Sequence, residues 1–157
     1  MAAPDDCAIR PYEPDDLRAA AALWYRAWHD DRPGERHAHP IEWWRARWRD
    51  RVVPQAAIHV ATVDGAVAGY VAAFHAAPWL SHVVVTLEYR RRGIGTRLLE
   101  AAKGASSGGL VFDVFEDDTS ARAFYAGCGL TAGETLPHPR SGRPMVRYTW
   151  SPPPPVA

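Results

Sequence analysis

Apolar side chains recur along the chain with two different periods, and each period predicts one type of secondary structure. Residues 56–63 and 66–76 alternate with a two-residue period, which is typical of half-buried strands, and Asp64-Gly65 between them is a hairpin turn signal. Short apolar runs predict further strands at residues 7–12, 79–87, 110–115 and 143–150, and a last one that begins at Leu130.

Four other segments place apolar residues on one face of a helix, with spacings of three, four and seven. Asp117 to Ser120 supply capping side chains for the last of them, which we expect to end at Gly129. Polar or small-residue loops are expected over residues 30–39 and 103–109. The apolar faces are Leu17, Ala20, Ala21, Trp24 and Trp28 in residues 14–29; Ile41, Trp44 and Trp48 in residues 41–51; Ile94, Leu98, Ala101 and Ala102; and Ala121, Phe124, Tyr125 and Cys128.

Strands and helices are therefore interspersed along the chain, which predicts a single α/β domain over residues 1–150. A length of 157 residues with 47% hydrophobic side chains is enough for one sizeable core. Residues 151–157 contain four prolines and are expected to form a disordered tail.

Charge and cysteine content narrow the range of functions. The formal net charge is zero and the pI is about 7.1, so we expect no partner among nucleic acids and no membrane surface. The chain has no apolar run of membrane-spanning length and begins with an acidic segment unlike a signal peptide, so a cytoplasmic location is expected. Cys7 and Cys128 are expected to be reduced, and no metal-ligand pattern is evident.

The segment from Val83 to Leu99 carries the clearest functional signal. Val83, Val84 and Val85 end at a polar turn, and Arg90-Arg91-Arg92-Gly93-Ile94-Gly95-Thr96 leads into a helix. The first N–H groups of a helix lack intrahelical partners, glycine allows a ligand to approach the backbone, and arginine adds forked donors. This turn is therefore predicted to hold a phosphate or pyrophosphate.

The spacing of the glycines selects among phosphate-binding motifs. It fits neither a Walker loop nor the dinucleotide fingerprint, which would need a glycine where Leu98 stands. Arg90-x-x-Gly93-x-Gly95 after a strand resembles the pyrophosphate motif of the GNAT family of acetyl-CoA-dependent N-acetyltransferases. A second signature of that family resembles Asp118-x-x-Ala121-x-x-Phe124-Tyr125 followed by Gly129-Leu130, although the family usually has Asn at position 118, Phe at 130 and Pro at 87.

The resemblance implies a GNAT-type acyl-CoA N-acyltransferase fold, an α/β fold with a mixed, mostly antiparallel sheet of six to seven strands and about four flanking helices. It also implies that the fourth and fifth strands splay apart to admit the pantetheine arm of acetyl-CoA, with no metal. The implied cofactor-binding residues are Val83, Val84, Val85, Arg90, Arg91, Arg92, Gly93, Ile94, Gly95, Thr96, Asp118 and Phe124.

Acetyl transfer to an amine needs a group that takes the amine proton and an acid for the departing thiolate. The resemblance makes Tyr125 the candidate acid, with a purely structural aromatic as the alternative. No carboxylate lies at the start of the fourth strand, so His82 is the nearest titratable candidate for the base. Asp113, Glu116, His29 and a water relay remain alternatives, whereas Glu88 is expected to be a solvated surface residue.

Five of the seven tryptophans fall in the first two predicted helices, the region that lines the acceptor pocket in the family. Trp28, His29 and Trp43 are the candidate acceptor-binding residues, although simple packing is the competing explanation for tryptophans at core spacing. The loop Pro137 to Gly142 is a candidate to close over the site.

Three functions follow from these patterns. The favoured hypothesis is an N-acetyltransferase that moves the acetyl group of acetyl-CoA directly to a primary amine on a small molecule or peptide, acting as a monomer or homodimer. A non-catalytic acyl-CoA-binding module of the same fold is the alternative, because a carboxylate base is not evident. An ATP-binding protein is the third, but the chain lacks a Walker lysine.

Overall fold

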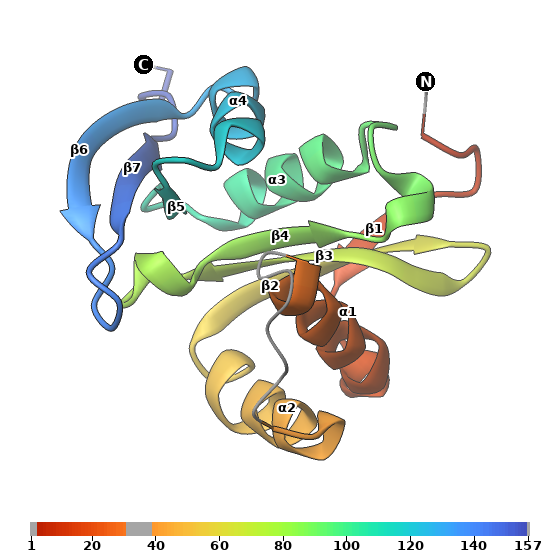
Figure 1. The fold of residues 1–157 in the computed structure, drawn as a ribbon. Coiled ribbons are helices and arrows are strands. Elements are labelled where there is room, and N and C mark those ends of the chain that lie inside the picture. Colours follow the sequence, from red (N-terminus) through yellow and green to blue (C-terminus); the bar gives the residue numbers. More distant parts are fainter. Residues whose placement is uncertain (1–2, 31–38, 157) are drawn as a thin grey trace.

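Seven strands form two separate antiparallel sheets in the computed structural model, which describes residues 3–30 and 39–156 (Figure 1). The first sheet has the order β1-β2-β3-β4 and the second the order β5-β7-β6. The strands are β1 (Ala8–Pro11), β2 (Ala56–Val63), β3 (Ala66–Phe74), β4 (His82–Val85), β5 (Leu110–Phe115), β6 (Thr131–Pro137) and β7 (Pro144–Trp150). The predicted hairpin between β2 and β3 is confirmed, with both Asp64 and Gly65 at positive φ.

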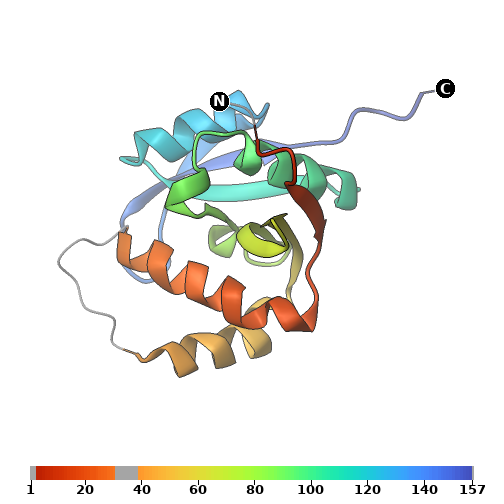
Figure 2. The same ribbon diagram turned by 90° about the vertical axis from the view of Figure 1, so that its right-hand side faces the viewer.

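Helices cover both faces of the first sheet (Figures 1 and 2). On one face lie α1 (Leu17–Asp30), preceded by a 3₁₀ turn at Pro14–Asp16, and α2 (Ile41–Arg47), which continues as a π turn over Trp48–Val52. On the other face lie α3 (Ile94–Ala105) and α4 (Thr119–Gly127). The predicted α/β fold class is confirmed, with an antiparallel arrangement of every strand pair in the described chain.

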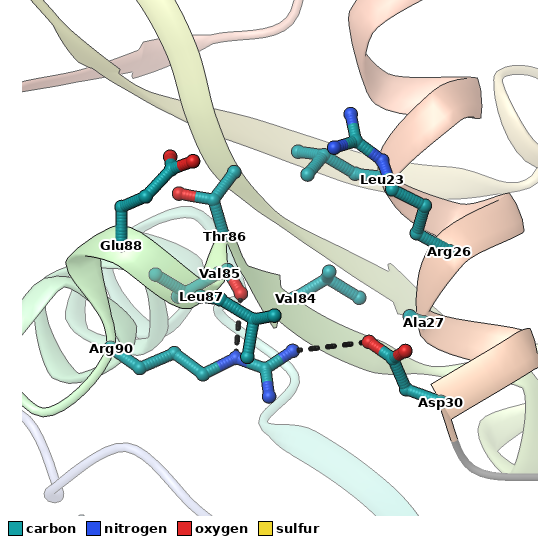
Figure 3. Close-up of a pocket in the computed structure, with 10 residues that line it drawn as sticks. All are labelled: Leu23, Arg26, Ala27, Asp30, Val84, Val85, Thr86, Leu87, Glu88 and Arg90. Atoms are coloured by element: carbon teal, nitrogen blue, oxygen red, sulfur yellow. Dashed lines mark hydrogen bonds and ion pairs between the residues drawn. The ribbon is translucent and has the colours of Figure 1, made fainter. Parts of the chain in front are cut away.

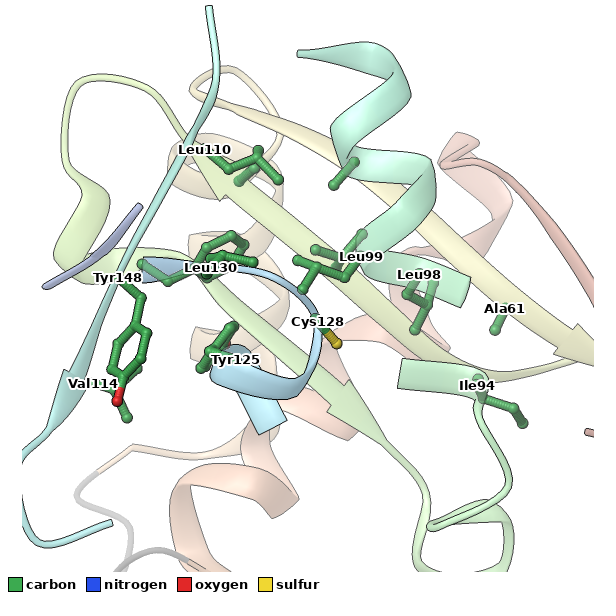
Figure 4. Close-up of a cluster of buried hydrophobic side chains, with 14 of the residues drawn as sticks. Ala61, Ile94, Leu98, Leu99, Leu110, Val114, Tyr125, Cys128, Leu130 and Tyr148 are labelled. Atoms are coloured by element: carbon green, nitrogen blue, oxygen red, sulfur yellow. The ribbon is translucent and has the colours of Figure 1, made fainter. Parts of the chain in front are cut away.

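Each helical layer buries its own apolar core against the strands. The α1 and α2 side centres on Trp48, Tyr70 and Val60, all fully buried. The α3 and α4 side joins the two sheets and contains Ile94, Leu98, Leu99, Phe112, Tyr125 and Tyr148 (Figure 4). Because this second core draws side chains from both sheets, it fixes α3 and α4 over the gap between β4 and β5.

Several boundaries differ from the sequence-based expectation. The strand predicted at 79–87 is wrong at both ends, because Pro78–Leu80 and Leu87–Tyr89 form 3₁₀ turns and leave β4 with four residues. The loop predicted at 103–109 is also wrong at its start, because α3 continues to Ala105. In this last turn of α3, Nζ of Lys103 donates to the Glu100 carboxylate and to the Cys128 carbonyl. The second helix changes to a π turn at Trp48. Most of the loop predicted at 30–39 lies outside the described residues.

None of the helices in residues 3–30 and 39–156 is both long enough and apolar enough to cross a bilayer. Within the same residues, no three His, Cys, Asp or Glu side chains gather as a metal site would require.

Candidate active site

The open edge of β4 faces β5 across the gap between the two sheets. β4 pairs with β3 on one side only, with Val83 opposite Val71 and Val85 opposite Gly69. The Thr86 N–H donates to the Ala68 carbonyl at 2.8 Å, so even-numbered positions of β4 bond to β3. By alternation, the N–H groups of Val83 and Val85 point toward the gap, whereas the Val84 backbone is used within the sheet.

The turn between β4 and α3 presents a row of backbone donors. Gly93 caps α3 in the left-handed region at φ 81°, and as a glycine it offers no side chain to cap the helix. The first intrahelical bond runs from Arg97 N–H to the Gly93 carbonyl at 3.1 Å, so the N–H groups of Ile94, Gly95 and Thr96 precede the helical ladder. Free N–H groups at a helix start, together with the helix dipole, are an arrangement that favours an anion.

Position 95 is closely packed, so a side chain there would require the Phe124 ring to shift. A Cβ atom built on Gly95 would lie 3.2 Å from Cε2 and Cζ of the Phe124 ring. Phe124, from the segment Asp118 to Leu130, therefore packs over the first turn of α3, which follows the Arg90 to Gly95 turn. Asp118 is the N-cap of α4, where its carboxylate accepts the Ala121 N–H at 3.0 Å. This bond explains an acidic side chain at position 118 without a ligand.

The three arginines of the turn lie in different environments. Nε of Arg90 donates to the Val85 carbonyl at 2.9 Å, and its guanidinium lies 3.8 Å from the Asp30 carboxylate (Figure 3). Arg92 lies over the Tyr89 ring at 5.6 Å from its centroid, and Arg91 is exposed with φ 60°. Arg90 therefore contacts the end of α1 through Asp30. Arg91 and Arg92 are the two arginines of the turn that do not make this contact.

A pocket of about 90 Å³ lies between the last turns of α1 and the end of β4 (Figure 3). Leu23 and Ala27 of α1 face Val84 across it, and Arg90 lies along its rim. The hydroxyl of Thr86, another lining residue, is buried without a hydrogen-bond partner in the described structure. Sequence reasoning missed the Arg90–Asp30 contact because it joins two segments 60 residues apart.

Tyr125 lies in the core beneath the gap rather than on an exposed surface. Its ring packs 5.0 Å from Phe112, 5.2 Å from Phe124 and 6.0 Å from Tyr148, measured between centroids. Burial, followed by the nearby Asp118 and Cys128, raises the pKa of this phenol well above its usual range. Tyr125 is therefore a protonated hydrogen-bond donor at neutral pH.

His82 lies at the start of β4 with its ring on the α1 face of the sheet. Nδ1 lies 2.6 Å from the Leu80 carbonyl, which can only accept, so the proton sits on Nδ1 and the lone pair on Nε2. The ring stacks on Trp24 at 6.1 Å and meets Tyr70 edge to face at 5.2 Å. Burial lowers its pKa to about 4, and Nε2 is buried with no partner among the described residues.

The alternative candidates for the base, Asp113, Glu116 and His29, differ in burial. The Asp113 carboxylate is buried and accepts two hydrogen bonds of 2.8 Å from the Arg147 guanidinium. This ion pair accounts for a buried carboxylate at position 113 without a catalytic role. Glu116, at the end of β5, and His29, in the last turn of α1, are exposed.

The aromatic residues predicted for the acceptor side gather where α1 meets α2. Trp28 packs 6.1 Å from Trp44, and Trp43 packs 5.3 Å from the same ring. The outer face of Trp43 stacks on His39 at 4.1 Å. These contacts make Trp28 and Trp43 part of one aromatic cluster with a buried centre, and Trp43 keeps a partly exposed ring.

The loop between β6 and β7 lies beside the gap from the other sheet. His138 packs 5.7 Å from Trp79, which lies just before β4, and 5.7 Å from Phe115, which ends β5. The predicted loop Pro137 to Gly142 is thus fixed near the ends of both strands that face the gap.

The comparisons with known proteins agree with this geometry. A model of the acetyltransferase (GNAT) family matches residues 17–130, and the chain therefore belongs to the GNAT acetyltransferase family. No curated protein sequence matches the chain significantly.

Solved structures share the fold over almost the whole chain. YncA of Salmonella typhimurium, solved with its cofactor acetyl-CoA, has a TM-score of 0.70 at 16% identity and covers 98% of each chain. An HPA2-related acetyltransferase of Corynebacterium glutamicum has a TM-score of 0.73 at 15% identity, covering 97% of this chain and 99% of that one. The ribosomal-protein-S18-alanine N-acetyltransferase of Escherichia coli has a TM-score of 0.65 at 19% identity, covering 91% and 92%.

Proposed function

We propose that this protein transfers the acetyl group of acetyl-CoA to a primary amine by direct attack of the amine on the thioester. The observation that carries the proposal is two sets of backbone donors, those of Val83 and Val85 on the free edge of β4 and those of Ile94, Gly95 and Thr96 at the start of α3. Amide groups at a strand edge suit an extended pantetheine arm, and a helix start suits a diphosphate. The acetyl-CoA-bound YncA structure of the same fold supports this ligand.

The chain's own groups have separate tasks in the reaction. Ile94, Gly95 and Thr96 would bind the diphosphate through backbone N–H groups, with Arg91 and Arg92 adding positive charge. The N–H groups on the β4 edge would orient the pantetheine amides and polarise the thioester carbonyl. Acetyl-CoA supplies an activated acyl group, so no metal or redox step is needed.

Two proton transfers complete the exchange, in which a C–N bond forms and the C–S bond breaks. Tyr125 is proposed to give its phenol proton to the departing sulfur and to regain a proton from water afterwards, since a tyrosine phenol is protonated at neutral pH. Nε2 of His82 carries the lone pair, but this atom is buried and burial lowers the pKa of the ring to about 4. The amine proton is therefore proposed to leave through a water relay rather than directly to His82.

The first experiment is a calorimetric titration with acetyl-CoA, using ATP as the control ligand, followed by CoA release with a panel of primary amines. Saturable binding of acetyl-CoA with amine-dependent release is the expected result. Absence of binding to the folded protein would overturn the proposal. Binding without release for every amine would leave the non-catalytic acyl-CoA-binding module as the function.

The variant Tyr125→Phe tests the assigned acid, and Tyr148→Phe is its control. Tyr148 is also buried, and its hydroxyl accepts a hydrogen bond from Nε of Arg122 at 3.2 Å. Loss of a general acid lowers kcat by about a hundredfold or more, while the affinity for acetyl-CoA should stay within about twofold. Equal kcat values for Tyr125→Phe and the wild type would remove the acid role.

A further inference from the structure

The Arg90 side chain takes up a hydrogen-bonding position on the free edge of β4. The Thr86 N–H donates to the Ala68 carbonyl, so the bonds between β4 and β3 fall at even-numbered positions of β4. Both the N–H and the carbonyl of Val85 consequently point away from β3 and into the gap. Nε of Arg90 donates to this carbonyl at 2.9 Å (Figure 3). The turn thus places a side chain on the same strand edge that the proposed function assigns to the pantetheine arm.

The other end of the guanidinium reaches across to α1. Nη2 of Arg90 lies 3.8 Å from a carboxylate oxygen of Asp30, the last residue of α1 (Figure 3). The two side chains are 45% and 48% exposed. An ion pair of this length between half-exposed groups is weak and is exchanged easily. Asp30 therefore holds the guanidinium beside β4 without fixing it there.

Two parts of acetyl-CoA compete for these contacts. The amide N–H groups of an extended arm need carbonyl acceptors, which a free strand edge offers beside its own N–H groups. A diphosphate carries more negative charge than a carboxylate and forms forked, charge-assisted bonds with a guanidinium. Arg90 belongs to the turn that leads into the N–H groups of Ile94 to Thr96, where the diphosphate is proposed to bind. One ligand would therefore need the carbonyl that Arg90 occupies and also attract the side chain that occupies it.

We propose that Arg90 exchanges partners when acetyl-CoA binds. The guanidinium leaves Asp30 and the Val85 carbonyl and moves to the diphosphate, and the carbonyl then accepts an amide N–H of the pantetheine arm. Asp30 is a positioning residue in this exchange, because it acts on the ligand only through Arg90. The inference rests on the proposed acetyl transfer and adds a coupling between the diphosphate end of the ligand and its thioester arm.

The first test separates the arm from the diphosphate. S-acetylpantetheine has the thioester and both amides of acetyl-CoA but no phosphate, so it cannot draw Arg90 away from Val85. Dissociation constants are measured by calorimetry, directly for acetyl-CoA and by displacement for S-acetylpantetheine. In Arg90→Met, which keeps the stem and removes the donors, acetyl-CoA should bind at least about threefold more weakly. S-acetylpantetheine should bind about two- to tenfold more tightly, the range that corresponds to the net contribution of one hydrogen bond.

Arg92→Met is the matched control for this substitution. Arg92 belongs to the same turn but lies over the Tyr89 ring rather than on the edge of β4. Its loss should weaken acetyl-CoA binding and leave the affinity for S-acetylpantetheine unchanged. Opposite shifts of the two ligands in Arg90→Met support the exchange, because damage to the fold would weaken both. An unchanged or weaker affinity of Arg90→Met for S-acetylpantetheine overturns it.

The variant Asp30→Asn tests the second partner of the guanidinium. Loss of the carboxylate should tighten acetyl-CoA binding about two- to fivefold, the upper range for an exposed ion pair. The gain should be absent when Arg90→Met is already in place. Glu88→Gln removes the same charge from another residue that lines the pocket and should not reproduce the gain. A gain that persists in the double variant is a general effect of charge on an anionic ligand and overturns the positioning role of Asp30.

These measurements concern binding alone, so they distinguish the exchange from the proposed reaction. Opposite shifts of the two ligands support the exchange even if no amine is acetylated. Acetyl-CoA that binds to the wild type without these shifts in the variants overturns the exchange and leaves acetyl transfer intact. Failure of acetyl-CoA to bind the folded wild type overturns both.

Discussion

Acidification should destabilise the folded protein through His82 in a pH range set by its burial. The ordinary pKa of the imidazole is 6.5, whereas the folded protein holds it at about 4 because burial disfavours the charged ring. Between these two values the unfolded chain binds a proton that the folded chain does not. Stability is therefore unaffected above pH 7, falls as the pH drops from about 6.5 to 4, and loses nothing further through this group below pH 4.

The size of the effect follows from the difference between the two pKa values. With 1.36 kcal/mol per pKa unit, His82 costs about 2 kcal/mol of unfolding free energy at pH 5 and about 3 kcal/mol at pH 4. His82→Phe keeps an aromatic ring between Trp24 and Tyr70 but removes the titration. We therefore expect the variant to lose about 2 kcal/mol less than the wild type between pH 7 and pH 5.

The assay is urea unfolding followed by tryptophan fluorescence at pH 7, 6, 5 and 4. Carboxylates that become protonated in this range do so in both proteins, so the difference between wild type and variant isolates the imidazole. The exposed His75 provides the control, since His75→Gln should follow the wild type. Identical pH dependence of His82→Phe and wild type would refute the placement of a neutral, buried imidazole at position 82.

Two further predictions concern the turn and the second sheet. Gly93→Ala should destabilise the protein by about 1–2 kcal/mol, because alanine is strained at the φ of 81° that Gly93 adopts. Gly104→Ala in α3, where a Cβ atom also has open space, should be neutral or stabilise the protein by up to about 1 kcal/mol. Urea unfolding of both variants measures the two changes in unfolding free energy. Arg147→Met should cost about 3 kcal/mol, because it leaves the buried Asp113 carboxylate unpaired, and the double variant with Asp113→Asn should recover part of that loss. Full additivity of the two substitutions would contradict the ion pair.

Local patterns were sufficient for most of the secondary structure. Alternation marked β2 and β3, and helical spacing marked α1, α3 and α4, because these periods follow directly from backbone geometry. The Arg90 to Thr96 motif predicted a helix start at this point of the chain, and α3 does begin there, after a glycine with positive φ. The same reasoning overextended β4, because an apolar run does not reveal where a 3₁₀ turn replaces extended backbone.

Tertiary structure decided what the individual side chains can do. Only the separation of the two sheets shows that Val83 and Val85, but not Val84, direct their N–H groups into the gap. The lone pair of His82 and the contact of Arg90 with Asp30 depend on the burial that folding creates or on segments that are distant in the chain. The sequence by itself determined the class of elements and one local turn motif, whereas ion pairing and protonation arose from long-range packing that no short pattern encodes.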